Sequence, residues 1–166
     1  MKINLINLLN SEQDSLSVDY QLDLSDFIYG TYNPVKEPVS VKGRLYSKAD
    51  VLYIDLDIKF TFYGVCDRCA EEIKKDFSIT LNKIIVEELQ NIDNDDDYIV
   101  VENQLLDLDA LVNEEISLSL PSKMLCNDDC KGLCPKCGTN LNVKKCDCKS
   151  DVDPRMAALL QLLDNE

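Results

Sequence analysis

Apolar and polar residues alternate along the segment from residue 52 to residue 62. Its apolar positions are Leu52, Ile54, Leu56, Ile58, Phe60 and Phe62. Successive side chains of a β-strand point to opposite faces of the sheet, so a period of two is typical of a strand. The pattern therefore predicts a long strand with one buried face and one face toward water.

Shorter segments with the same alternation flank this strand. The preceding segment has apolar residues at Val39, Val41 and Leu45, and the following one has them at Phe77, Ile79 and Leu81. A short polar connection, residues 47–50, separates the first two segments. Strands joined by such short connections pair antiparallel. We therefore expect an antiparallel β-meander whose charged face is solvated.

Two other segments have apolar residues at helical spacing. In the first, Asp107 is a favourable N-cap residue, Pro121 blocks continuation, and the apolar residues between them include Leu111, Val112 and Ile116. In the second, Asp153 and Pro154 favour a helix start, and the apolar stripe is Met156, Leu159, Leu160 and Leu163. We expect helices near 107–119 and within 151–166, and hence an α+β fold.

The charge distribution divides the 166 residues into three parts. Residues 1–120 contain 10 Lys or Arg and 24 Asp or Glu, whereas residues 121–150 contain six Lys and three Asp. We expect an acidic β-rich body over 1–120, a cysteine-rich module over 121–150, and an amphipathic helix over 151–166. An acidic body repels the phosphate backbone of nucleic acids.

Composition also narrows the compartment and the chemistry. The chain has no apolar run of about 18 residues and no secretory signal pattern, which predicts neither a membrane span nor export. Eight cysteines in such a chain indicate a reducing compartment, and we expect the cytoplasm. The chain has no His, which excludes Ser-His and Cys-His catalysis, so a zinc site must use sulfur or carboxylate ligands.

Six of the cysteines form the strongest chemical pattern, at positions Cys126, Cys130, Cys134, Cys137, Cys146 and Cys148. The Cys134-Pro-Lys-Cys137-Gly sequence is typical of a zinc knuckle, because two thiolates at this spacing reach one tetrahedral ion. Gly138 can adopt the positive φ that such a turn requires. The surrounding segment has few large aliphatic residues, so metal binding would supply much of its folding free energy.

The spacing leaves the allocation of ligands open. The favoured zinc site uses the most local four-thiolate set, Cys126, Cys130, Cys134 and Cys137. A possible second site uses the remaining four cysteines, Cys146, Cys148, Cys66 and Cys69. A redox pair of thioredoxin type is the alternative for Cys66 and Cys69. The neighbouring Asp67, Glu71 and Glu72 argue against it, because they oppose thiolate formation.

The order of several motifs is more specific than any one of them. These are Cys66-Asp-Arg-Cys69, the helical segment 107–116, Cys130-Lys-Gly-Leu-Cys-Pro-Lys-Cys-Gly138, Asn140-Leu-Asn142 and Asp153-Pro-Arg155. In this combination the chain resembles the YceD family, the large ribosomal RNA subunit accumulation proteins. The resemblance implies a role in 23S rRNA accumulation or processing and in large-subunit assembly, with no known catalytic residue. We therefore expect a noncatalytic protein.

Charge indicates which partners such a protein would suit. The acidic body is suited to a basic ribosomal protein or an assembly factor of the large subunit, and the positive cysteine module is the part suited to a 23S rRNA precursor. We expect no membrane partner and no small-molecule substrate. Three alternatives are a zinc-dependent interaction module outside the ribosome, a thiol oxidoreductase, and a magnesium-dependent nuclease. The nuclease would use carboxylates such as Asp93, Asp95, Asp107 and Asp109.

Overall fold

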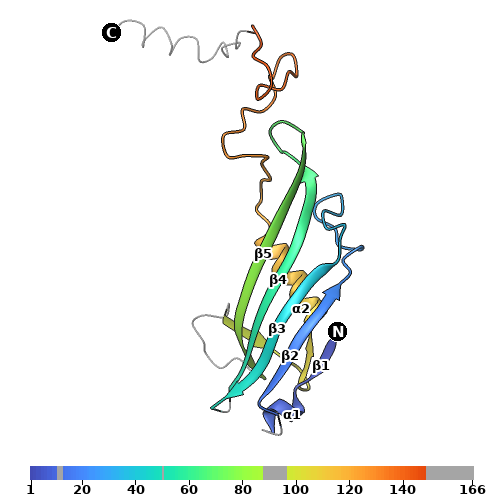
Figure 1. The fold of residues 1–166 in the computed structure, drawn as a ribbon, viewed down its shortest axis with the longest axis vertical. Helices are drawn as coiled ribbons and strands as arrows, with labels where there is room; N and C mark the ends of the chain where they lie inside the picture. The colour runs from blue at the N-terminus through green and yellow to red at the C-terminus, as the bar shows by residue number, and fades with distance from the viewer. Residues whose placement is uncertain (11–12, 50, 88–96, 149–166) are drawn as a thin grey trace, which may run out of the picture.

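The computed structural model describes residues 1–10, 13–49, 51–87 and 97–148. Figure 1 shows a long twisted sheet with a helix across one face, and the cysteine-rich segment at the far end of the longest hairpin. The C-terminal helix expected within 151–166 lies outside the described residues. Among the helices that are described, none has the length and apolar character needed to cross a membrane.

The main sheet has the strand order β2-β3-β4-β5-β6. Its first four strands, β2 (Ser15–Leu22), β3 (Val39–Lys48), β4 (Val51–Val65) and β5 (Glu72–Val86), pair antiparallel in sequence order. The predicted meander is therefore confirmed, and β2 extends it at the N-terminal side. The last strand, β6 (Tyr98–Val100), pairs parallel to β5, so the expectation of a purely antiparallel sheet is wrong at this edge. A parallel partner requires a crossover connection, which alternation within single strands does not reveal.

The alternation in β4 separates the two faces of this sheet. All of its predicted apolar residues, from Leu52 to Phe62, are buried in one core. On the other face, charged side chains lie across from side chains that are oppositely charged or polar and uncharged. Asp57, for example, lies opposite Lys42 of β3 and Thr80 of β5. The charged groups of this face thus have polar neighbours on the adjacent strands, as expected for the solvated side of an antiparallel sheet.

The helix α2 (Leu108–Ser119) covers the apolar face. The Asp107 carboxylate accepts a hydrogen bond from the backbone N–H of Ala110 at 3.3 Å, and the helix ends at Ser119, two residues before Pro121. The helix prediction and its cap are confirmed. The helix buries Leu108, Leu111, Val112 and Ile116. An ion pair between Lys83 of β5 and Glu115 also ties the helix to the sheet.

The N-terminal segment completes the fold on the helix side. The strands β1 (Lys2–Asn4) and β7 (Leu105–Asp107) form a second, two-stranded antiparallel sheet, and the short helix α1 (Ile6–Leu9) follows β1. The single core also includes Met124, Cys66, Cys69 and Cys130. The apolar interior thus continues from the sheet into the start of the cysteine-rich segment. The division of the chain into a body, a module and a terminal helix stays a prediction.

Candidate metal centres

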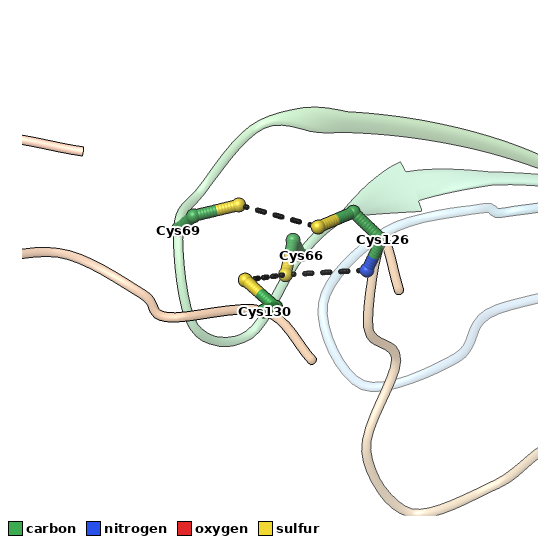
Figure 2. Close-up of side chains that lie close together, drawn as sticks. All are labelled: Cys66, Cys69, Cys126 and Cys130. Carbon is green, nitrogen blue, oxygen red and sulfur yellow. Dashed lines mark hydrogen bonds between the residues drawn. The ribbon is translucent and has the colours of Figure 1, made fainter. Parts of the chain in front are cut away.

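Two of the cysteines lie at the tip of the β4–β5 hairpin. The tip is closed by hydrogen bonds from Cys66 N–H to Glu71 O at 2.8 Å and from Ala70 N–H to Cys66 O at 2.9 Å. Ala70 adopts a positive φ of 58°, which turns the chain sharply after Cys69. Figure 2 shows the Cys66 and Cys69 side chains facing Cys126 and Cys130 from the segment that follows α2.

These four residues form the first cysteine cluster. The Cys66 and Cys130 sulfurs are 3.7 Å apart, as are the Cys69 and Cys126 sulfurs, and all four sulfurs lie within 4.8 Å of one another. Sulfurs bound tetrahedrally to zinc at the usual bond length are about 3.8 Å apart. The first cysteine cluster therefore has the dimensions of a four-thiolate zinc site.

Residues between the two hairpin cysteines hold the later segment in place. The Asp67 carboxylate accepts a hydrogen bond from Met124 N–H at 2.6 Å, and Asp67 N–H donates to Met124 O at 2.9 Å. The Arg68 guanidinium donates to Cys130 O at 3.0 Å, and its backbone oxygen accepts from Leu133 N–H at 3.1 Å. Asp67 and Arg68 thus fix the position of Cys126 and Cys130 relative to the hairpin.

Hydrogen bonds to sulfur make the thiols of this cluster unequal. Burial raises the pKa of Cys66, but backbone N–H groups of Cys126, Arg68 and Cys69 outweigh it and lower the pKa to about 6. The hydrogen bond with Cys130, together with burial, raises the pKa of Cys126 to about 12. Backbone donors directed at the sulfur thus lower the pKa of Cys66 although Asp67, Glu71 and Glu72 are close in the sequence.

The second cysteine cluster consists of Cys134, Cys137, Cys146 and Cys148, whose sulfurs also lie within 4.8 Å of one another. The knuckle turn has Gly138 at a positive φ of 70°, with its N–H donating to Cys134 O at 2.9 Å. The Thr139 hydroxyl lies 3.1 Å from the Cys137 sulfur, and this contact is the main cause that lowers the pKa of Cys137 to about 6. Cys137 and Cys148 are exposed, so this cluster is more open to solvent than the first.

The structure distributes the predicted ligands differently from the favoured set. Cys126 and Cys130 meet Cys66 and Cys69, whereas the Cys134 and Cys137 pair meets Cys146 and Cys148. The two halves of the favoured set are thus not brought into one cluster. Sequence spacing favours neighbouring pairs, but the hairpin tip lies beside the segment after α2, a contact between residues 57 to 64 positions apart. Which thiols bind metal stays a prediction.

Two asparagines from the loop between Cys137 and Cys146 contact the first cysteine cluster or the hairpin that carries it, and the sequence did not single them out as site residues. The Asn140 amide donates to the Glu71 carboxylate at 2.7 Å, and the Asn142 amide donates to the Cys130 sulfur at 3.3 Å. The Asn140-Leu-Asn142 motif was the sequence signal that could have identified these two residues as part of the site. Side chains that hydrogen-bond to metal ligands orient these ligands and tune their charge.

The carboxylates considered for magnesium have other partners or cannot be assessed. Asp107 caps α2. Asp109 binds the N-terminal amine and accepts a hydrogen bond from the Tyr20 hydroxyl at 3.0 Å. Asp93 and Asp95 lie outside the described residues. The described members of this set are therefore engaged in holding the N-terminus and α2, and they do not form a shared site.

Comparison with known proteins gives a family match over most of the chain. Residues 54–163 match the family model described as large ribosomal RNA subunit accumulation protein YceD. This region begins in β4 and includes all eight cysteines. No solved structure matches this chain.

Several curated proteins are similar over a large part of the chain. The YlbN protein of Bacillus subtilis is 33% identical over 76% of this chain and 74% of its own length. A chloroplastic protein of Arabidopsis thaliana, named large ribosomal RNA subunit accumulation protein YCED homolog 1, is 30% identical over 76% of this chain and 46% of its own. A Mycobacterium tuberculosis protein of strain H37Rv is 28% identical over 62% of this chain and 51% of its own. The matches thus span only about half of the plant and mycobacterial proteins.

Proposed function

Because this chain belongs to the YceD family of large ribosomal RNA subunit accumulation proteins, we propose that it is a noncatalytic factor in 23S rRNA accumulation or processing and in assembly of the large ribosomal subunit. The family match over residues 54–163 carries this proposal. The name of the Arabidopsis relative supports the same role in ribosome biogenesis. We further propose that the protein works in the cytoplasm, where bacterial ribosomes assemble.

A scaffolding role for the cysteines supports the noncatalytic assignment. Each of the eight sulfurs lies in a group of four whose sulfurs are within 4.8 Å of one another. Zinc fits these donors best, because it favours four thiolates in a closed tetrahedral site. We propose that two zinc ions bind, one in each cluster. The ion in the first cysteine cluster would cross-link the β4–β5 hairpin to the segment after α2 through its zinc–sulfur bonds. This cross-link would hold the second cluster in a fixed position.

Charge favours a basic protein as the direct partner. A zinc ion with four thiolates has a net charge of about −2, so two loaded clusters contribute about −4. Two of the eight thiolates belong to Cys66 and Cys69 of the hairpin, so within residues 121–150 six thiolates and two zinc ions contribute about −2, against an excess of three from six Lys and three Asp. The loaded residues 121–150 are then nearly neutral, and together with the hairpin cysteines they are slightly negative, which weakens their suitability for 23S rRNA. A basic ribosomal protein or assembly factor therefore suits the acidic body best, and the nearly neutral loaded module does not repel it.

A thiol oxidoreductase is the second candidate, because the pKa of Cys66 is lowered to about 6. Reactive cysteines also need access to their substrate. Cys66 is only 2% exposed and Cys69 only 4%. The Cys66 sulfur faces that of Cys130, and the Cys69 sulfur faces that of Cys126. Burial within a four-sulfur cluster suits a metal ligand better than a nucleophile that attacks a protein disulfide.

Sedimentation of extracts from growing cells tests the proposed function. We expect the protein to migrate with immature large subunits, and to be displaced by high salt if the contact is electrostatic. A C66S/C69S variant should remain near the top of the gradient, because it loses the first cysteine cluster, while a Ser40→Ala variant should migrate as the natural protein does. A natural protein found only at the top of the gradient, or bound to partners unrelated to ribosomes, would contradict the proposal.

A further inference from the structure

The two cysteine clusters are connected through one amide side chain. Asn142 lies between Cys137 and Cys146, in the loop that joins the two halves of the second cysteine cluster. Its amide nitrogen lies 3.3 Å from the sulfur of Cys130, which belongs to the first cysteine cluster. A residue in the loop between two cysteines of the second cluster therefore donates a hydrogen bond to a ligand of the first.

The orientation of this amide is fixed by its oxygen. Asn142 Oδ1 accepts a hydrogen bond from Lys131 N–H at 2.8 Å, so Nδ2 must be the atom that faces sulfur. The backbone N–H and the Nδ2 of Asn142 also both donate to Asn140 Oδ1 at 2.9 Å. Asn140 in turn donates to Glu71 at the hairpin tip. The loop of the second cluster is thus held against both chain segments of the first.

Metal binding at either cluster should therefore assist the other. An ion bound to the second cluster restrains the loop from Cys137 to Cys146 and holds Asn142 in place. The amide then directs its N–H at the Cys130 sulfur, and a hydrogen bond of this kind orients a ligand toward its metal ion. An ion in the first cluster conversely holds Cys130 where Asn142 can reach it. Such a coupling free energy is reciprocal by thermodynamic necessity.

We propose that the two cysteine clusters bind metal cooperatively and that Asn142 is the positioning residue through which they are coupled. This inference rests on the proposed metal binding but goes beyond it. Chains without metal and chains with two ions are the main species, and chains with one ion are scarce. The hairpin and the cysteine-rich segment therefore lock together in one step.

Native mass spectrometry of the full chain, reduced and mixed with one equivalent of zinc, tests this directly. Two independent sites, whatever their affinities, leave at least half of the chains with one ion. Tenfold coupling between sites of equal affinity leaves only about a quarter in that state. We expect the one-zinc fraction to be well below half. A one-zinc fraction of half or more would overturn the proposal.

An Asn142→Asp variant tests the role of the amide. It keeps the oxygen that accepts from Lys131 but removes the donor to Cys130. We expect its one-zinc fraction to rise to half or more, with about tenfold weaker binding of the ion in the first cluster. The control is Asn113→Asp, an exposed asparagine on α2, which should behave as the natural chain does.

The outcomes separate this proposal from those on which it depends. An Asn142→Asp variant with the natural distribution of species would refute the role of Asn142. A natural chain that binds no zinc would remove the metal proposal and the coupling with it. In that case migration with immature large subunits would still support the ribosomal function.

Discussion

The Asp67 carboxylate at the tip of the β4–β5 hairpin accepts a 2.6 Å hydrogen bond from the backbone N–H of Met124, 57 residues later in the chain. The backbone N–H of Asp67 in turn donates a hydrogen bond to the backbone oxygen of Met124. Met124 precedes Cys126 by two positions and is itself buried in the core. This reciprocal pair brings the cysteine-rich segment to the hairpin and sets the spacing of the first cysteine cluster.

Replacing Asp67 by Ala should therefore weaken the attachment of this segment. We expect the free energy of unfolding of the zinc-loaded protein to fall by about 1–2 kcal/mol, because a charge-assisted bond is lost and Met124 N–H loses its partner. Urea unfolding measures this change. Asp128→Ala is the matched control, since the exposed Asp128 carboxylate has no hydrogen-bond partner among the described residues. Equal stabilities of the two variants would refute the attachment role of Asp67.

The ion pair between Lys83 and Glu115 should stabilise the packing of α2 on the sheet. Its side chains are 21% and 14% exposed, whereas those of the Lys42 and Asp19 pair on the solvated face are 63% and 69% exposed. We expect Lys83→Ala to lower the free energy of unfolding by about 2 kcal/mol, between the values for exposed and buried pairs. Lys42→Ala should cost less than about 1 kcal/mol. Urea unfolding that finds equal losses for the two variants would contradict this ranking.

Zinc stoichiometry distinguishes the grouping in the structure from the favoured grouping in the sequence. A variant with Ser at the four positions of the first cysteine cluster, 66, 69, 126 and 130, keeps the second cluster intact. We therefore expect it to bind one zinc ion, and the natural chain two, by elemental analysis of the reduced protein. If Cys126 and Cys130 instead share an ion with Cys134 and Cys137, this variant would have two thiolates at each site and retain no tightly bound zinc.

The fold was predictable from the sequence where the signal is local. Alternation identified the β3–β4–β5 meander, and the Asp107 cap with its apolar spacing identified α2 to within one residue. The strand β2 was missed, although Leu16, Val18, Tyr20 and Leu22 alternate as clearly as the residues of β3. The parallel pairing of β6 was not predictable, because the choice of a sheet edge depends on the path of the chain between the strands.

The cysteine clusters were predictable as a set of ligands but not as a grouping. Residue type and spacing identified all eight cysteines, and the Cys134 and Cys137 pair does lie within one cluster. The partners of each pair depend on where the β4–β5 hairpin ends relative to the segment after α2. That position follows from core packing around Met124 and from Asp67, which are long-range contacts without a signature in the local sequence.

The ratio of 23S to 16S rRNA in cells depleted of this protein tests the central claim most directly. If the chain supports accumulation of the large-subunit RNA, the ratio should fall on depletion, with 23S precursors retained, and recover when the natural protein is restored. Restoring the variant with Ser at positions 66, 69, 126 and 130 should fail to recover it. An unchanged ratio in fully depleted cells would contradict the account.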